Sequence, residues 1–225
     1  MRETTQITYG DGIVSVELIS ESKSDIPAPV IRFGDYEKVL ESCFTRKELE
    51  EIYEGDHASL TFSFVMSDSP EEIEEYDTLV SAVSRASKNF GELSEGIALE
   101  VNAVKSVDAG EELTIDNLLG NVELQIEIPL YLIRENREYY LMTDSFGACT
   151  LYEDYDNEAD TLSVNTNTVG TSMLIYRDTY PGVPVAETSS FGVKPQFIFG
   201  GIVIILLVFW NYVTGARKQR LKEQR

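Results

Sequence analysis

The C-terminal apolar run constrains this chain more than any other feature. Residues Phe197 to Val213 read FIFGGIVIILLVFWNYV without a charge, and Gly215 and Ala216 extend the run. A helix needs about 20 apolar residues to cross roughly 30 Å of hydrocarbon, and backbone groups in lipid must pair within the segment. We therefore predict one transmembrane helix over 197–216; the alternative is a buried helix of a soluble core. The residues expected to anchor it are Phe197, Ile202, Leu206, Trp210 and Tyr212, the last two at the headgroup layer.

The charges that flank this run predict which way it faces. Five basic residues and one acid, Glu223, follow it, whereas only Lys194 lies close before it. Because basic residues gather on the cytoplasmic side of membrane spans, we expect a single-pass protein of the cell membrane with its N-terminal domain outside and its tail in the cytoplasm. The alternative is a tail-anchored protein with a cytoplasmic bulk. The residues expected to fix the topology are Arg217, Lys218, Arg220, Lys222 and Arg225.

The negative net charge bears on which kinds of partner the chain can bind. The chain carries −21, and because the last nine residues carry +4, residues 1–216 carry −25. Nucleic-acid binding requires cationic groups on the surface, so we expect no nucleic-acid partner. An acidic surface keeps an exposed domain soluble and could hold divalent cations loosely. A solvated acidic surface is the simpler interpretation.

The first residues carry no recognisable export signal. Met1 begins MRETTQITYGDG, which lacks the apolar core of a secretory signal peptide. A domain of this size needs such a signal to reach the outside of a cell. We therefore expect the chain to be the C-terminal piece of a longer exported protein, or the product of a truncated gene.

Three helices are predicted in the first half of the chain. Asp35 is expected to cap a short helix that ends near Cys43. Residues 45–48 (Thr-Arg-Lys-Glu) form a capping box, in which the threonine and glutamate side chains each bond a free amide. Residues 69–72 (Ser-Pro-Glu-Glu) predict a second capping box with proline at the first helical position, and that helix should end near Gly91.

Alternation of apolar and polar residues predicts a series of strands. The expected strands are 13–19, 60–66, 97–103, 122–128, 137–143, 148–152, 161–166 and 171–177. Helices followed by closely spaced strands indicate an α+β fold, with short N-terminal helices, an antiparallel sheet or sandwich, and the C-terminal transmembrane helix. The expected organisation is an N-terminal strand and linker at 1–29, an extracellular α+β module at 30–178, a spacer at 179–196, the span at 197–216 and the basic tail at 217–225.

Few residues could carry chemistry. His57 is the only histidine, in a predicted turn, and no G-x-S-x-G motif is present. A zinc ligand set cannot be assembled from so few His and Cys residues. Cys43 is expected to be a buried thiol, with an optional bridge to Cys149 as the alternative. We expect no catalytic residue and no cofactor, although plentiful acids leave a glycosidase-type carboxylate pair open.

An alternating acidic series is the best candidate metal site. It resembles the start of a calcium-binding loop, which requires Gly at its sixth place and an acidic ligand at its twelfth. Those places hold Ala159 and Asn165, so we favour a polar hairpin turn over a calcium site. The weak candidate ligands are Asp154, Asp156, Glu158 and Asp160.

Short motifs also follow one another in a particular order. In chain order they are Val39-Leu40, Thr45 to Leu49, Gly55 before Leu60–Met66, Ile97–Val101, Ile126-Glu127-Ile128-Pro129, Arg137-Glu138-Tyr139-Tyr140, Asp154-Tyr155-Asp156 and Tyr176-Arg177-Asp178. This order resembles a module at the C-terminal end of large surface proteins of Gram-positive anaerobic bacteria. There the module typically follows adhesin-like, Ig-like or leucine-rich repeats and precedes a membrane or wall anchor.

The sequence departs from that family pattern at two places. The family's His-Asp-Gly turn is Asp144-Ser145-Phe146-Gly147 here, and its Phe-Ser-Thr-Tyr strand is 169–173, Val-Gly-Thr-Ser-Met. The resemblance implies a structural, membrane-proximal module and brings no catalytic residue with it.

These patterns together predict a non-enzymatic, membrane-anchored cell-surface module that acts as stalk and anchor for upstream adhesive or binding domains. Its expected partner is the lipid bilayer, contacted through the C-terminal helix. The alternatives are an ectodomain that binds calcium or an extracellular protein, and a surface glycoside hydrolase.

Overall fold

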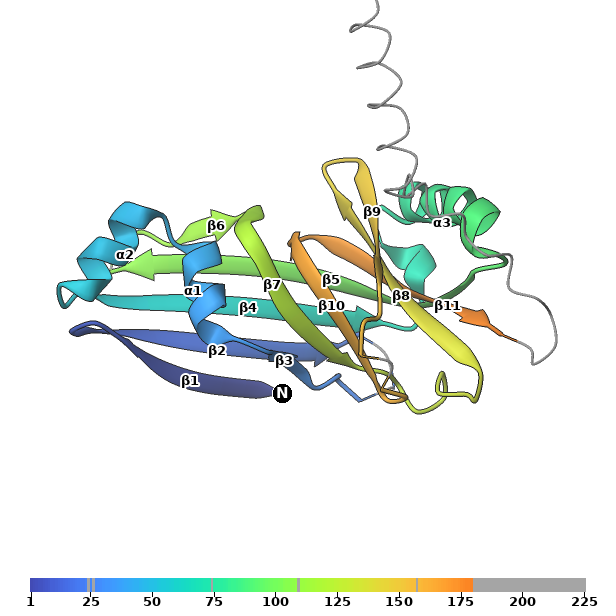
Figure 1. Ribbon diagram of the computed structural model, residues 1–225, viewed down its shortest axis with the longest axis horizontal. Coiled ribbons are helices and arrows are strands. Elements are labelled where there is room, and N and C mark those ends of the chain that lie inside the picture. Colours follow the sequence, from blue (N-terminus) through green and yellow to red (C-terminus); the bar gives the residue numbers. More distant parts are fainter. Residues whose placement is uncertain (24, 26, 74, 109, 157, 180–225) are drawn as a thin grey trace, which may run out of the picture. The chain divides into compact units, whose positions relative to one another are not determined.

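The computed structural model describes residues 1–179 except 24, 26, 74, 109 and 157 (Figure 1). The predicted span at 197–216, the tail at 217–225 and nearly all of the spacer lie outside these residues. Within the described part, no helix is long and apolar enough to cross a membrane.

The described chain is built around a mixed sheet of eight strands. Its order is β1-β2-β4-β5-β11-β8-β9, and β6 pairs with β5 beside that path. The last strand, β11, therefore lies inside the sheet, between β5 and β8. The bounds are β1 Arg2–Tyr9, β2 Gly12–Ser22, β4 His57–Ser67, β5 Ser94–Val107, β6 Leu113–Ile115, β8 Arg137–Ser145, β9 Ala148–Glu153 and β11 Thr171–Asp178.

A smaller sheet and two helices share the main core with one face of the large sheet. The small sheet has the order β10-β7-β3, and Figure 1 shows β7 and β10 crossing the large sheet. Phe33 packs on Phe62 with ring centroids 4.8 Å apart, and a fully buried side chain of this size contributes about 1.5–3 kcal/mol. The bounds are β3 Ile31–Phe33, β7 Asn117–Glu127, β10 Thr161–Thr168, α1 Tyr36–Cys43 and α2 Arg46–Tyr53.

One longer helix covers part of the opposite face of the large sheet. α3 (Tyr76–Phe90) follows a single 3-10 turn, η1 (Pro70–Glu72). Its buried residues Leu79, Ala82 and Val83 recur at the three- and four-residue spacing that places side chains on one helical face. They form a second core with residues of β5, β8, β9 and β11.

The α+β class is confirmed, with mostly β structure in a sandwich-like arrangement and a few helices. The expectation of wholly antiparallel pairing is wrong, because β2 and β4 pair in parallel from Ile13↔His57 to Ser22↔Met66. The chain between these strands passes through β3, α1 and α2, and parallel neighbours require a long crossover of this kind. The α-helices of the described chain all lie in its first half, as predicted, although β1, β2 and β3 precede them and β4 lies between α2 and α3.

The two predicted capping boxes differ in outcome. At α2, the Glu48 amide donates to Thr45 Oγ1 (3.4 Å) and the Thr45 amide donates to Glu48 Oε2 (2.5 Å). The second box is wrong: the Ser69 side chain makes no capping bond, and residues 70–72 form η1. The Ser69 amide donates instead to Ser67 Oγ at 3.1 Å, and the α-helix begins only at Tyr76.

The N-terminal residues form a hairpin rather than a single strand. β1 pairs with β2 from Arg2↔Ile19 to Tyr9↔Gly12, and the turn packs so closely on α2 that a Cβ at Gly12 would lie 2.0 Å from Ile52 O. Val14, on β2, is fully buried in the main core. The sheet and its core therefore run across the boundary predicted at residue 29.

Candidate functional site

Two of the sequence motifs lie side by side at the end of the last strand. β11 pairs with β8 in the register Tyr176↔Tyr139, Arg177↔Glu138 and Asp178↔Arg137. Two oppositely charged pairs therefore stand directly across from each other, an arrangement that stabilises neighbouring strands. We call Arg137, Glu138, Tyr176, Arg177 and Asp178 the C-terminal clamp.

Arg137 is the central side chain of the C-terminal clamp. Its guanidinium donates to Asp178 Oδ1 at 2.6 Å and to Oδ2 at 2.9 Å, and to Leu132 O at 2.8 Å. It also lies over the Tyr176 ring, 3.6 Å from the centroid. The Arg137 side chain is only 2% exposed, and Asp178 is 36% exposed. The bond from Arg137 holds the pKa of Asp178 below its usual range.

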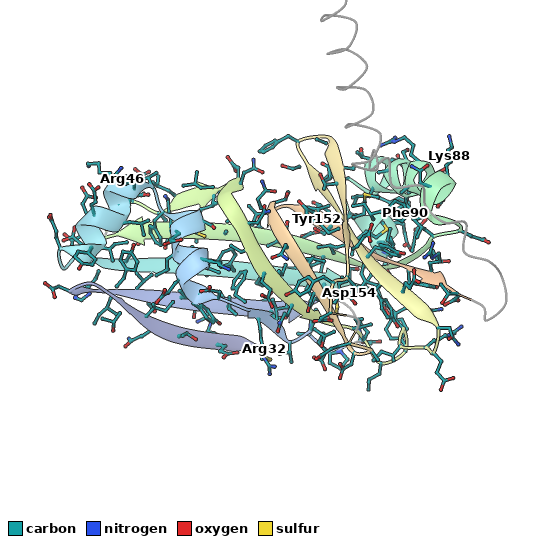
Figure 2. The ribbon with its side chains drawn as sticks, in the orientation of Figure 1. Arg32, Arg46, Lys88, Phe90, Tyr152 and Asp154 are labelled. Atoms are coloured by element: carbon teal, nitrogen blue, oxygen red, sulfur yellow. The ribbon has the colours of Figure 1, made fainter. Side chains whose placement is uncertain are left out.

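On the other face of these strands, Arg177 bonds to Glu138 of β8 and to Phe90 of α3. Its guanidinium donates to Glu138 Oε2 through Nε (3.1 Å) and Nη2, and to Phe90 O at the end of α3 through Nη1. Phe90, labelled in Figure 2, also packs edge-on against Tyr140 with ring centroids 5.8 Å apart. Burial, and a hydrogen bond from Tyr140 Oη to Glu138, raise the pKa of Tyr140. The clamp therefore ties β11 to β8 and to α3.

The last described residue continues this pattern. The Thr179 amide and hydroxyl both donate to Asn136 O, at 2.6 and 2.8 Å. The chain is thus bonded to the residues before β8 up to the position where the predicted spacer begins.

The acidic series forms a turn at one side of the small sheet. Asp156 Oδ1 accepts the Glu158 amide at 2.9 Å, and Asp154 Oδ1 accepts the Ser163 amide at 3.1 Å. Asp154, labelled in Figure 2, is half-buried, and this burial raises its pKa. The carboxylate of Asp156 therefore bonds a backbone amide of the turn itself, and that of Asp154 bonds a backbone amide of β10.

Three members of the acidic series share a polar hollow of about 340 Å³ with Glu127 and Arg32. Those members are Asp156, Glu158 and Asp160. In the residues that the structure describes, no group of three or more His, Cys, Asp or Glu side chains could hold a metal ion. The hollow does not bring the predicted ligands into a coordination shell.

The remaining candidate groups lie apart from one another. His57 is exposed at the start of β4. Both cysteines are free: Cys43 is buried and Cys149 is partly buried. Burial raises the pKa of Cys43 to about 12 and that of Cys149 to about 11. Both thiols therefore stay protonated at neutral pH and are weak nucleophiles.

A partly buried ion pair between β5 and α2 was not predicted from the sequence. Lys105, on β5, donates to Glu48 Oε2 at 2.6 Å and to Cys43 O at 2.9 Å, so it joins the end of α1 to the start of α2. Burial alone would raise the pKa of Glu48, but bonds from Lys105 and Thr45 hold that pKa below its ordinary value. A lysine within an alternating strand was the available signal, but it does not identify its partner.

Comparison with models of protein families, with curated proteins and with solved structures finds no match for this chain. The resemblance to the bacterial surface module therefore rests on the sequence motifs alone.

Proposed function

We propose that this chain is a non-enzymatic, single-pass surface module that holds an acidic folded domain outside the cell membrane. As a stalk and anchor, it would carry adhesive or binding domains placed upstream. The observation that carries the proposal is the uncharged run from Phe197 to Val213, followed at once by five basic residues. Such a run is long enough to span a bilayer, and such a flank is typical of its cytoplasmic end.

The C-terminal clamp supports this proposal. A module tied to a membrane through its C-terminus needs its last strand to be held firmly in the domain. β11 is an inner strand, its final residues bond to β8 and to α3, and Thr179, which follows it, bonds to the loop before β8. The −25 charge of residues 1–216 suits a solvated domain that does not bind anionic lipid.

Membrane extraction tests the anchor. The full chain, expressed behind a secretion signal in a Gram-positive host, should stay in the membrane fraction after alkaline carbonate washing. The double change Leu206→Arg and Val208→Arg should release it, because each central arginine costs about 2.5–3.5 kcal/mol of insertion free energy. The matched control, Leu206→Ile with Val208→Ile, should remain in the membrane. Equal retention of all three proteins would sink the proposal.

Thiol labelling tests the orientation. Glu50→Cys places a thiol on the exposed surface of α2, and Gln224→Cys places one in the tail. In intact cells an impermeant maleimide should label the Glu50→Cys protein, and it should label Gln224→Cys only after lysis. The native cysteines give a low background because the pKa values of Cys43 and Cys149 are raised to about 12 and 11. Labelling of the tail alone would instead support the tail-anchored alternative.

A further inference from the structure

The first strand leaves one edge of the large sheet unpaired. β1 stands at the end of the strand order and pairs with β2 alone among the described residues. Met1 and Ser20 exchange both of their backbone hydrogen bonds. Bonded and non-bonded pairs alternate in an antiparallel ladder, so the amides and carbonyls of Arg2, Thr4, Gln6 and Thr8 point away from β2.

This edge lacks most of the features that usually block strand addition. Natural edge strands are shortened, bulged, or supplied with Pro or with charged side chains, Lys above all. β1 has eight residues, RETTQITY, without Pro or Lys, its only charges are Arg2 and Glu3 at its first end, and its register with β2 is unbroken. By contrast, β9 at the opposite edge has six residues, and its Tyr152 hydroxyl shares a hydrogen bond with Thr168 of β10 at 2.8 Å. β1 is therefore the longer and more open of the two edges of the large sheet.

The edge is complementary to itself. An antiparallel pair of β1 strands centred on Thr5 sets Arg2 across from Thr8 and Thr4 across from Gln6, so every outward amide and carbonyl meets a partner. Glu3 then lies across from Ile7, and no two like charges face each other. Pairing centred on Thr4 would leave the outward groups of Thr8 without a partner, and pairing shifted further toward the N-terminus would bring Glu3 against Glu3 or Arg2 against Arg2, which is unfavourable. Pairing shifted the other way leaves the outward groups of Arg2 without a strand partner.

We propose that β1 of one copy pairs with β1 of a second copy, which joins two large sheets into one continuous sheet. The contact is a single strand pair and is smaller than a standard stable interface, and both copies are strongly acidic. The dimer therefore forms weakly, is strengthened by salt, and is favoured by high local concentration in a membrane. The strand pairing itself does not require the proposed anchoring, whereas its enrichment by crowding in a membrane rests on it.

A disulfide at the two-fold centre reports the pairing and its register. In the full chain with Thr5→Cys, reconstituted at high density in phosphatidylcholine vesicles, the two thiols face each other as a non-hydrogen-bonded pair, about 4.5 Å between Cα atoms. Diamide takes two electrons and two protons from them, and a dimer that dithiothreitol reverses should appear. The wild type, with Cys43 and Cys149 only, and Thr4→Cys should each give at least tenfold less.

A proline at a position whose amide points away from β2 distinguishes pairing of the β1 edges from association through another surface. Gln6→Pro in the Thr5→Cys chain removes no bond to β2, so thermal unfolding should be unchanged while the crosslink falls at least tenfold. The matched control Gln6→Ala keeps the amide and should keep the crosslink. If Gln6→Pro fails to fold, Thr8→Pro is the second blocking change.

Two results would overturn the proposal. One is an equal crosslink with and without proline, which would show association through another surface. The other is no crosslink from Thr5→Cys at vesicle densities where the chain is crowded. A crosslink to a foreign strand in place of a second copy, seen as a heterodimer in whole membranes, would likewise reject self-pairing.

Discussion

At the scale of single residues, the buried guanidinium of Arg137 gives the first prediction about stability. Arg137→Met keeps the buried volume but removes three hydrogen bonds and leaves Asp178 without its partner. Breaking a fully buried pair costs about 3–5 kcal/mol. Because Asp178 is 36% exposed, we expect a loss of about 2–3 kcal/mol in the free energy of unfolding. Urea denaturation of the full chain in detergent micelles measures it.

The control is an exposed ion pair of the same chemistry. Arg46 and Glu50 lie 3.0 Å apart on α2 with side chains 94% and 64% exposed, so Arg46→Met should change the stability by no more than about 0.5 kcal/mol. Similar losses from the two substitutions would show that burial of Arg137 has no role.

The pH dependence of the same pair gives a second prediction. The pKa of Asp178 is lowered in the folded state by Arg137, so its stabilisation is fully present above the unfolded pKa of about 3.9 and is lost as pH falls through the lower folded value. The stability difference between wild type and Asp178→Asn should therefore be constant from pH 7 to pH 5 and shrink below about pH 4. A difference that grew on acidification would contradict the assignment.

At the scale of elements, the capping box of α2 predicts a local loss. Thr45→Ala removes the hydroxyl that accepts the Glu48 amide and should lower the free energy of unfolding by about 1 kcal/mol. Thr45→Ser keeps the hydroxyl and should remain within a few tenths of the wild type. Chemical denaturation compares the three proteins, and equal losses from both changes would assign the effect to the lost methyl group.

Some helices and strands could be predicted from the sequence and others could not. α1 and the strands that became β4, β5 and β7 each bury a regular row, such as Val122, Leu124 and Ile126, and this periodicity can be read from the sequence. α2 buries only Ile52, but its capping box marks its start. β1 is polar and sits at an edge, and β3 and β6 have only three residues. None of them has a periodic row to detect. The parallel pairing of β2 and β4 depends on the path of a long crossover, which local patterns do not encode.

The motifs of the candidate site could be found in the sequence, but the contacts between them could not. The motifs at Arg137 and Tyr176 stood out in the sequence, but their direct pairing depends on the position of β11 inside the sheet. The acidic series stood out as well, and its turn geometry follows from Asp side chains that bond nearby amides. Lys105 and Glu48 are 57 residues apart, and no sequence pattern linked them.

At the scale of the whole molecule, charge is the dominant variable. Residues 1–216 carry −25, and self-repulsion of this size destabilises a compact state. Adding NaCl should therefore raise the melting temperature of the full chain in detergent by a few degrees, because salt screens the exposed charges. Scanning calorimetry between low and physiological ionic strength measures the change, and a fall in melting temperature would contradict it.

The melting temperature in CaCl₂ can be compared with that in NaCl at the same ionic strength. A specific site that prefers the folded state would add stability beyond screening. We expect millimolar CaCl₂ to match NaCl of equal ionic strength, because the described acidic turn gathers no three ligands around one point. An additional rise in melting temperature, abolished by Asp156→Asn, would favour the calcium-binding alternative.

The inner position of β11 has a mechanical consequence. Ladder hydrogen bonds run across the strands, so a pull along β11 from Asp178 loads its bonds with β5 and with β8 at the same time. The strand would have to slide past both neighbours at once, rather than peel away one bond after another. Forced unfolding is governed by the rate of that first rupture. The domain is thus arranged to resist tension best along the direction in which its last strand leaves the sheet.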